Sequence, residues 1–332
     1  MNVLVTGGAG FIGSNLVRCL VASGDRVTVL DDLSGRSLED LVYLADAVEL
    51  IVGDVRDRQA VDRAMRGVDV VYHLAAVPPA VGRPTEPRTT RLVIAGGTLN
   101  ILLAARDAGV RRVVNASSSL VYGETQSLPQ REDQPGAPWT PFAASKLTAE
   151  GYCWAFTRSR WLETVTLRLF NAFGPRHDRS SRRGGVVARF VTRMLEGRPP
   201  VVYGDGRQTR DLTYVANVIQ ACMLAGSAGP EAVGQIVNVG GGGSLSVLEL
   251  IGLLNELLGT ALEPVFGPAV PGDVRRSEAS IARAELLLGY RPLVGLRQGL
   301  ELTLGWTAQR ERRGRHVDRH ERRPSSMMVR SG

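Results

Sequence analysis

The sequence predicts an α/β fold: a Rossmann-like doubly wound parallel sheet with helices on both faces, followed by a smaller C-terminal part. Short apolar runs alternate with helical patterns through the first half of the 332-residue chain. A glycine-rich loop joins the first run to the first helical pattern, and two acidic residues end the second run. We expect the Rossmann-like domain to cover residues 1–170. A substrate-binding part, interleaved with it, is expected over residues 171–308.

The predicted strands are short runs rich in Val, Leu and Ile, as expected for strands buried on both faces of a parallel sheet. They cover residues 2–6, 26–30, 48–52, 68–72, 111–116 and 164–169. Helical patterns fill the gaps between them, most clearly over residues 97–108 and 143–158. Beyond Asn171 the loops are longer, and two shorter helices are predicted there, at 245–258 and 281–288.

The loop after the first strand has glycines at Gly7, Gly10 and Gly13. The first permits a tight turn, the second lets the backbone approach a pyrophosphate, and the third allows close helix–strand packing. The following helix N-terminus favours an anion. Asp31 and Asp32 end the second strand, where a carboxylate accepts from adenosine ribose hydroxyls and repels a 2′-phosphate. These features predict an NAD site in preference to NADP.

Further candidates for the cofactor site follow from where the predicted strands end, because ligands of such sheets bind at the carboxyl ends of the strands. After the third predicted strand these candidates are Asp54 and Val55, and after the fourth they are Leu74, Ala75 and Ala76. Phe11 and Ile12, in the glycine loop, complete the set.

Lys146 is the only lysine of the chain, against 39 arginines. An ammonium is a compact point donor and a guanidinium a planar fork, so this exception indicates a specific role at the cofactor. The net charge is +7, of which residues 309–332 contribute +5 through eight arginines and three acidic residues. That segment is polar and lacks apolar periodicity, so we expect a disordered tail. A solvated tail is favoured over one that binds nucleic acid.

Several classes of protein are disfavoured by composition. No run of 18 apolar residues is present, so no membrane span is expected. Cys19, Cys153 and Cys222 are scattered and odd in number, which suits a reducing compartment, and Met1 leads directly into the first strand rather than a secretory signal. We therefore expect a cytoplasmic protein. Neither the cysteines nor the four histidines have metal-ligand spacing, so no metal site is predicted.

Taken together, eight motifs make residues 1–308 resemble the extended short-chain dehydrogenase/reductase family. Within it, the chain is similar to NAD-dependent nucleotide-sugar epimerases of the UDP-hexose 4-epimerase kind. The motifs are TGGAGFIG at 6–13, VLDDLS at 29–34, GDVRD at 53–57, HLAA at 73–76, ASSSLVYGE at 116–124, RLFNAFGPR at 168–176, YGDGRQTRDLTYV at 203–215 and PGDVRRSEAS at 271–280.

The resemblance implies a mechanism. A tyrosine, aided by a serine, removes the proton of the sugar 4-hydroxyl while hydride passes to NAD. The resulting 4-keto sugar rotates, and hydride returns to its other face. By position, Ser118 is that serine and Lys146 is the lysine that holds the nicotinamide ribose, whereas Phe142 stands where the family has its tyrosine.

The resemblance also implies a substrate and an oligomeric state. The substrate is a nucleotide sugar, and the subfamily indicates a UDP-sugar. The implied substrate-binding residues are Ser118, Asn171, Arg210, Asp273 and Arg275. Family members pair through helices corresponding to 97–108 and 143–158, so a homodimer is expected. The apolar residues of these helices exceed what a monomer usually exposes.

Four positions depart from the family's pattern. Phe142 cannot exchange a proton, Ile94 replaces an asparagine over the nicotinamide, Val270 replaces an arginine that grips the diphosphate, and Ala216 replaces an aspartate. We expect Arg275 or Arg276 to replace part of the grip lost at residue 270.

Residue 120 distinguishes this chain from two related kinds of nucleotide-sugar enzyme. Sugar-nucleotide dehydratases and UDP-glucuronate decarboxylases carry a glutamate where this chain has Leu120. A leucine moves no proton, so both activities are disfavoured.

Two hypotheses of different classes remain. In the first, the protein is an epimerase of UDP-glucose or UDP-N-acetylglucosamine in which another group moves the proton: Ser118 with a water, Tyr122, or a group of the substrate. In the second, it is a catalytically silent protein that binds NAD and a nucleotide sugar as a sensor or heteromeric partner. Loss of a positioned acid–base group costs about 10²–10⁴ in rate, so Phe142, together with Ile94, favours the second. The preserved Lys146, Ser118, Asn171 and Arg210 favour ligand binding under either hypothesis, and we place the epimerase first because most of the architecture serves it.

Overall fold

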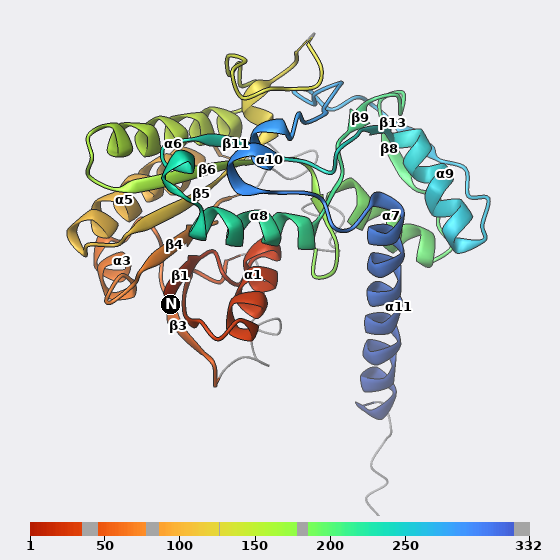
Figure 1. Ribbon diagram of the computed structural model, residues 1–332. Coiled ribbons are helices and arrows are strands. Elements are labelled where there is room, and N and C mark those ends of the chain that lie inside the picture. Colours follow the sequence, from red (N-terminus) through yellow and green to blue (C-terminus); the bar gives the residue numbers. More distant parts are fainter. Residues whose placement is uncertain (35–45, 78–85, 126, 178–184, 322–332) are drawn as a thin grey trace, which may run out of the picture.

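The computed structural model describes residues 1–34, 46–77, 86–125, 127–177 and 185–321. Its centre is one sheet of seven parallel strands in the order β11-β6-β5-β4-β1-β2-β3 (Figure 1). The strands are β1 (Asn2–Thr6), β2 (Arg26–Asp31), β3 (Val48–Val52), β4 (Val70–His73), β5 (Arg112–Ser118), β6 (Glu163–Leu169) and β11 (Ile236–Val239). The predicted fold class and the six predicted strands are confirmed, with shifts of one or two residues at their ends.

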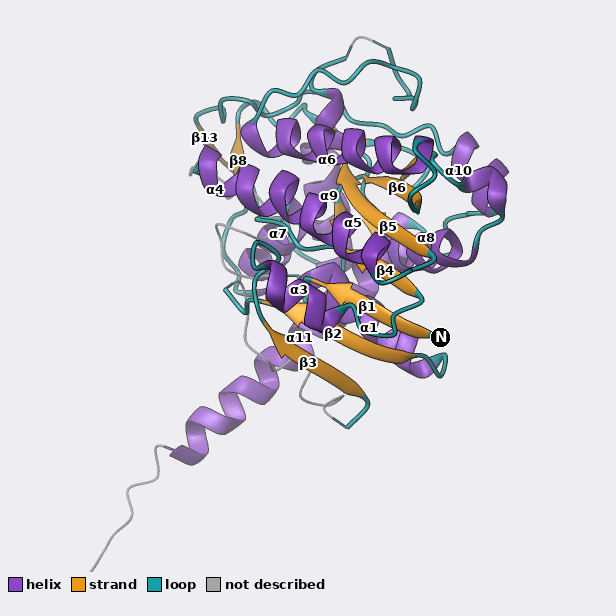
Figure 2. Ribbon diagram, turned by 90° about the vertical axis from the view of Figure 1, so that its left-hand side faces the viewer, coloured by secondary structure: helices purple, strands orange, loops and turns teal. Residues whose placement is uncertain are grey.

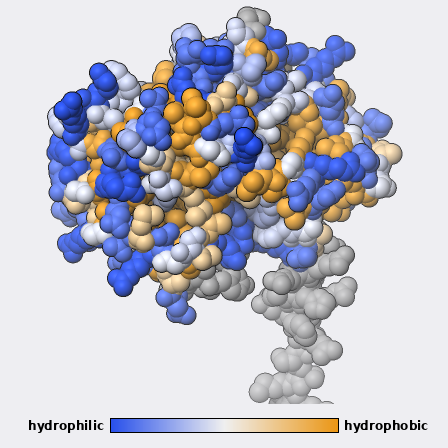
Figure 3. Space-filling model, in the orientation of Figure 1, coloured by the Kyte–Doolittle hydropathy of each residue, from blue (hydrophilic) through white to orange (hydrophobic). Residues whose placement is uncertain are grey.

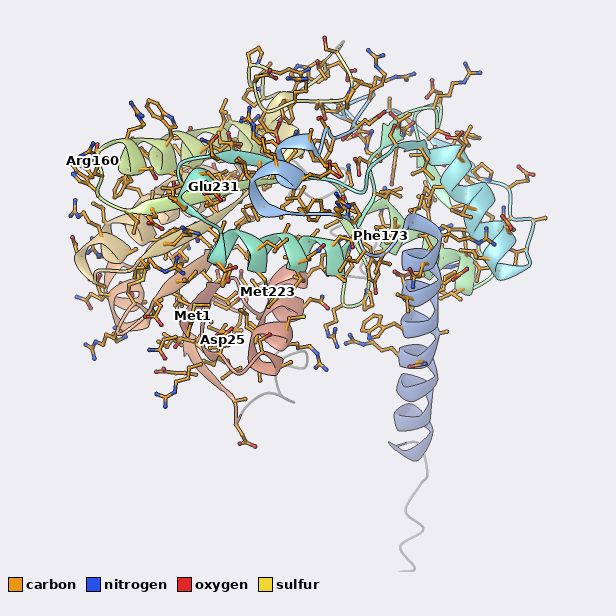
Figure 4. The ribbon with its side chains drawn as sticks, viewed as in Figure 1. Met1, Asp25, Arg160, Phe173, Met223 and Glu231 are labelled. Atoms are coloured by element: carbon orange, nitrogen blue, oxygen red, sulfur yellow. The ribbon has the colours of Figure 1, made fainter. Side chains whose placement is uncertain are left out.

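Helices cover both faces of this sheet. On one face lie α3 (Arg58–Ala64), α5 (Gly97–Asp107) and α6 (Pro141–Arg158), which stand in front of the strands in Figure 2. On the other face lie α1 (Phe11–Ala22) and α8 (Val215–Ser227). Each layer closes over its own buried cluster of aliphatic side chains. The start of β1 is fixed where the Met1 amino group meets Asp25, 2.8 Å away (Figure 4).

The seventh strand and α8 come from the segment that the sequence analysis assigned to the C-terminal part. β11 pairs with β6 in parallel, from Ile236↔Thr166 to Val239↔Leu169. The chain therefore leaves the sheet after β6, forms part of the second region, and returns to complete the sheet. Both strand and helix were missed from the sequence. The division at residue 170 stays a prediction.

Most of the rest of the C-terminal part lies beyond the carboxyl edge of the sheet, around α9, whereas α10 packs against β11 and α8 (Figure 1). Its helices are α7 (Val186–Leu195), α9 (Val247–Leu258) and α10 (Ala282–Leu288), and its short strands are β7 (Ala172–Phe173), β8 (Val201–Tyr203), β9 (Thr209–Arg210), β10 (Thr213–Tyr214), β12 (Leu245–Ser246) and β13 (Val265–Gly267). Ser246 and Glu249 form a capping box that begins α9. The two predicted helices of this part are thus present. Apolar residues also reach its surface, among them Leu248, Val265 and Phe266 (Figure 3).

The chain ends in a long helix, α11 (Leu296–Glu321), whose last turns project from the body (Figure 1). Leu300 and Leu304 anchor its first half in the core. The prediction of disorder from residue 309 was therefore wrong as far as Glu321. Arginine and glutamate are good helix formers, and the helix already nucleated by its buried half continues through them. Residues 322–332 lie outside the described residues. Among those described, no helix is long and apolar enough to cross a membrane.

Candidate active site

The glycine loop at the end of β1 has the shape that its sequence predicts. Gly7 has φ +69°, and a methyl group there would lie 2.8 Å from Cα of Ala75. A methyl group at Gly13 would lie 2.1 Å from the carbonyl oxygen of Gly7. Gly10 is the N-cap of α1, with no side-chain cap and no acid in the first turn. The first backbone N–H groups of α1, at Phe11 and Ile12, are therefore available to an anionic ligand.

The acidic pair lies beside this loop. Asp31 accepts hydrogen bonds from the backbone N–H groups of Ala9 and Leu33, both at 2.9 Å, and burial raises its pKa. Asp32 accepts from the N–H and hydroxyl of Ser34. A carboxylate has about four lone-pair directions, so Asp31 keeps acceptor capacity for ribose hydroxyls while it holds the loop to β2.

The neighbouring strand ends complete this side of the site. The backbone N–H of Leu74 donates to Thr6, and Ala75 lies against Gly7. At the end of β3, Asp54 accepts from the backbone and guanidinium of Arg56, and the side-chain hydrogen bond lowers the pKa of its carboxyl. Val55 is buried against α5. A close-packed glycine cradle, an uncapped helix N-terminus and a carboxylate at the second strand fit a dinucleotide.

Lys146 lies on α6, and its Nζ donates to the carbonyl of Ala116 on β5 at 2.5 Å. Only 5% of the residue is exposed, and burial lowers the pKa of its amine to about 8, partly opposed by Glu150. Thr140 caps α6, and Pro141 occupies its first turn. Half-buried Phe142 therefore precedes Lys146 by four residues, on the same face of the helix. A neutral ring stands one turn from the only lysine.

A buried ion pair holds this part of α6 on the sheet. The guanidinium of Arg168, on β6, makes two hydrogen bonds to Glu150, at 3.0 and 2.8 Å. Ser117, on β5, donates to the same carboxylate at 2.5 Å. All three side chains are buried. Such pairs require well-aligned partners to offset desolvation, so the arrangement fixes one position of α6 and hence of Lys146.

The structure distinguishes two candidate proton carriers. Ser118, half-buried at the end of β5, accepts from the backbone N–H of Leu120 at 3.2 Å and keeps its own hydroxyl proton for donation. Tyr122 is 2% exposed, and its hydroxyl donates to Asn238 of β11 at 2.7 Å. Burial raises the pKa of Tyr122 to about 12. The hydroxyl of Tyr122 is thus engaged inside the core, which favours Ser118 over Tyr122 as the proton carrier.

A series of buried hydrogen bonds supports the segment around Ile94. Here the backbone forms one π-helical turn, Leu92–Gly96, after α4 (Pro87–Arg91), a feature frequent at functional sites. Thr98 donates to the carbonyl of Ile94 at 2.6 Å, so its oxygen accepts from Nε2 of His73. Nδ1 of His73 then accepts from Thr6 at 2.7 Å. Burial lowers the pKa of His73 to about 3, so the imidazole is neutral and ties this turn to β1.

A pocket of about 190 Å³ lies between α7, β8 and the 270–273 loop. Its lining includes Asn171, Arg210 and Asp273, three of the residues expected to contact the substrate. Arg275 is not among its lining residues: its exposed guanidinium lies 3.1 Å from Asp205. The substrate contact expected of Arg275 stays a prediction.

Another arginine, Arg189 of α7, lines the pocket instead. Sequence reasoning missed it because no helix had been predicted there. The signal that could have found it is the amphipathic pattern of residues 186–195, with an arginine in its second turn.

The fold and this site define a class: enzymes of the short-chain dehydrogenase/reductase type that use a nicotinamide dinucleotide. Residues 3–240 match the model of the NAD dependent epimerase/dehydratase family. The chain belongs to this family, and NAD is its cofactor.

Three relatives illustrate the similarity. UDP-glucose 4-epimerase of Mycolicibacterium smegmatis is 39% identical over 316 residues, 92% of this chain and 97% of that protein. The structure of UDP-glucose 4-epimerase from Thermotoga maritima with UDP-glucose has a TM-score of 0.88 and 34% identity, covering 94% of this chain and 100% of that one. A tyrosine-to-phenylalanine mutant of UDP-glucuronic acid 4-epimerase from Bacillus cereus, in complex with UDP-4-deoxy-4-fluoro-glucuronic acid and NAD, has a TM-score of 0.87 and 30% identity, covering 93% and 99%.

Proposed function

We propose that the protein is an NAD-dependent 4-epimerase of a UDP-sugar, of the UDP-glucose or UDP-N-acetylglucosamine type, in which residue 142 takes no part in proton transfer. The observation that carries the proposal is the placement of Lys146. It is buried, bonded to the end of β5 close in sequence to Ser118, and held by the Glu150–Arg168 pair. A chain that needed only a folded helix would not bury its single ammonium in this way.

The residues of the chain would act as follows. The N-terminus of α1 holds the pyrophosphate, Asp31 accepts from the adenosine ribose, and Lys146 binds the nicotinamide ribose. NAD supplies a reversible acceptor for the hydride at C4 of the sugar. Ser118 would take the proton of the 4-hydroxyl on the lone pair that Leu120 leaves free, while it passes its own proton to a water that carries it to solvent.

The second candidate is a protein that binds NAD and a nucleotide sugar without turnover. Phe142 is one turn from Lys146 and carries no ionisable group, and Tyr122 is committed to Asn238. A serine hydroxyl is also a weak base unless another group activates it. The Bacillus cereus relative holds NAD and a UDP-sugar analogue with one tyrosine replaced by phenylalanine, so in that protein both ligands bind after such a change.

The experiment separates binding from turnover. Native mass spectrometry of the purified protein, followed by denaturation, identifies retained NAD and nucleotide sugar. Conversion of UDP-glucose and UDP-N-acetylglucosamine is then followed by chromatography with added NAD, for wild type and for Lys146→Met. Turnover that disappears in Lys146→Met supports the epimerase. Binding of both ligands without turnover supports the second candidate, and absence of nucleotide-sugar binding overturns both.

A further inference from the structure

A group of contacts joins the helix of the glycine loop to the segment that follows Asn171. Asn15, in the second turn of α1, donates through Nδ2 to the carbonyls of Phe11 and Pro175, at 2.8 and 3.3 Å. Its Oδ1 accepts from NH1 of Arg176 at 2.9 Å. Asn15 and Pro175 are 160 positions apart in the chain. A single amide thus uses both its nitrogen and its oxygen to hold the segment after β7 against α1.

His177 adds a second contact at the same place and extends it to α7. Its ring stacks on that of Phe11, with centroids 4.1 Å apart and planes inclined by 2°. Its Nε2 accepts from the backbone N–H of Gly185 at 3.2 Å. Gly185 is the N-cap of α7, and Val186, which follows it, lines the pocket. The imidazole therefore links the glycine loop to the beginning of a pocket helix. We call Phe11, Asn15, Pro175, Arg176 and His177 the clamp.

The turn within the clamp has a strained backbone. Arg176 has φ +66°, in the left-handed region that residues other than glycine seldom adopt. Such a conformation is costly and persists where the surrounding contacts over-determine it. Here these contacts include the hydrogen bond from Arg176 to Asn15 and the stack of His177 on Phe11. The shape of the turn therefore depends on α1, and a change at the start of α1 should reach the turn.

The clamp has one end at each ligand site of the proposed enzyme. The backbone N–H of Phe11, at the start of α1 where no side chain caps the helix, is available to the cofactor pyrophosphate. At the other end, Asn171 lines the pocket, and its carbonyl accepts from the N–H of Thr213 at 3.2 Å. A ligand on either side restricts groups that belong to one connected segment. Once one ligand has ordered that segment, the second has less to order and binds more tightly.

We propose that Asn15 and His177 are positioning residues that couple the two sites, so that a dinucleotide bound at the glycine loop tightens binding of the nucleotide sugar. The inference rests on the proposed function for the identity of the nucleotide sugar. Both residues act through the clamp and not on the reacting atoms. Because coupling between two binding equilibria is reciprocal, the nucleotide sugar tightens binding of the dinucleotide by the same factor.

The test uses two ligand fragments that lack the groups through which the intact ligands would meet. ADP-ribose has no nicotinamide and UDP has no sugar, so coupling between them must pass through the protein. Calorimetry measures the Kd of UDP for the full chain after removal of bound nucleotide, with and without saturating ADP-ribose. For wild type we expect ADP-ribose to lower this Kd about 5- to 150-fold, the usual range of coupling between two sites.

Two variants break the clamp at different points. Asn15→Leu is similar in volume and loses the hydrogen bonds to Pro175 and Arg176. His177→Phe keeps a ring to stack on Phe11 and loses the acceptor for the N–H of Gly185. In both variants we expect the ratio of the two Kd values to fall below about two. A merely structural role would weaken UDP binding equally with and without ADP-ribose and leave this ratio unchanged.

Asn255→Leu is the matched control. The Asn255 amide also bridges backbone groups, since it donates to the carbonyl of Leu262 and accepts from the N–H of the same residue, at 3.1 and 3.0 Å. It lies on α9, outside the clamp, so this variant should keep the wild-type ratio. Loss of the ratio in Asn255→Leu as well would overturn the proposal, because general loosening of the chain would then explain the effect.

The other outcomes separate the coupling from the proposed function. Failure of the wild type to bind UDP overturns the proposed function itself. UDP binding that ADP-ribose leaves unchanged in wild type overturns the coupling alone. Retention of the wild-type ratio in either clamp variant also overturns it. Should Asn15→Leu fail to fold, as judged by thermal unfolding, His177→Phe decides by itself, because it replaces one ring with another on the half-buried side of the loop.

Discussion

Replacing Phe142 with tyrosine adds one hydroxyl to the N-terminal turn of α6. The ring is half-buried and the turn is fixed by the Thr140 cap and Pro141, so the new group needs no movement of the backbone. Because the site is partly open to water, the hydroxyl is not left unsatisfied, and we expect the free energy of unfolding to change by less than about 1 kcal/mol.

The expected gain in rate follows from the position of Lys146. A positioned acid–base group contributes about 10²–10⁴ in rate, which is about 2.7–5.4 kcal/mol of activation free energy at 1.36 kcal/mol per tenfold. Lys146 is one turn away, and a positive charge there lowers the pKa of the new phenol. If wild type lacks a proton carrier, 4-epimerase activity should rise by about that factor.

The pH dependence provides a second signature. The pKa of Lys146 is lowered to about 8, so its ammonium is present below that pH and is lost above it. The gain of Phe142→Tyr should therefore fall as the pH rises above about 8, where Lys146 loses its charge.

The assay is conversion of UDP-glucose by chromatography from pH 6 to pH 10, with Phe142→Leu as the control without a hydroxyl. Brisk wild-type turnover that Phe142→Tyr leaves unchanged would refute the reasoning and show that another group carries the proton. A gain shared by Phe142→Leu would show that relief of packing, not proton transfer, is responsible.

Three further predictions concern the cofactor, stability and assembly. Fluorescence titration should show tighter binding of NAD than of NADP, because Asp31 repels a 2′-phosphate, and Asp31→Asn should reduce the preference; tighter NADP binding by wild type would contradict the assignment. Ala216 is exposed in the first turn of α8, which has no acidic residue, so Ala216→Asp should raise the free energy of unfolding in urea by about 0.3–1 kcal/mol through the helix dipole. Its activity should stay at the wild-type level, and a large increase would show instead that residue 216 acts in the site. Light scattering at micromolar concentration should show a homodimer, since Leu92 and Trp154, beside and on α6, are 38% and 56% exposed; a monomer, or a dimer unaffected by Trp154→Glu, would exclude this interface.

The sequence predicted the parts of the fold whose signals are local. Each of the first six strands is a short run rich in Val, Leu and Ile, and the glycine loop lies between a strand and a helix where its spacing is specific. β11 has only four residues in a glycine-rich setting, and α8 is apolar around most of its circumference because it packs between the sheet and α1. Neither has the periodicity on which prediction depends.

The site residues also divide into those that local sequence signals predict and those that depend on partners distant in the chain. Lys146 and Ser118 could be placed because each lies at the end of a predicted strand or in a recognisable helix. The roles of Tyr122 and Arg275 depend on their hydrogen-bond partners, which are Asn238 and Asp205, respectively. These partners are 116 and 70 residues away in the chain. Arg189 was overlooked because only the fold shows that it lines the pocket.

The burial of Lys146 also determines how the protein responds to amine chemistry. Apart from the α-amino group of Met1, which is paired with Asp25, Lys146 carries the chain's only primary amine. Acylating reagents and lysine-directed cross-linkers therefore find no exposed lysine anywhere on the surface. Acylation of a lysine, detected as a single mass increment on one arginine-bounded peptide, would report opening of the contact between α6 and β5, where Lys146 donates to the carbonyl of Ala116. The chain thus contains its own single-position reporter of that opening, readable without a labelled ligand.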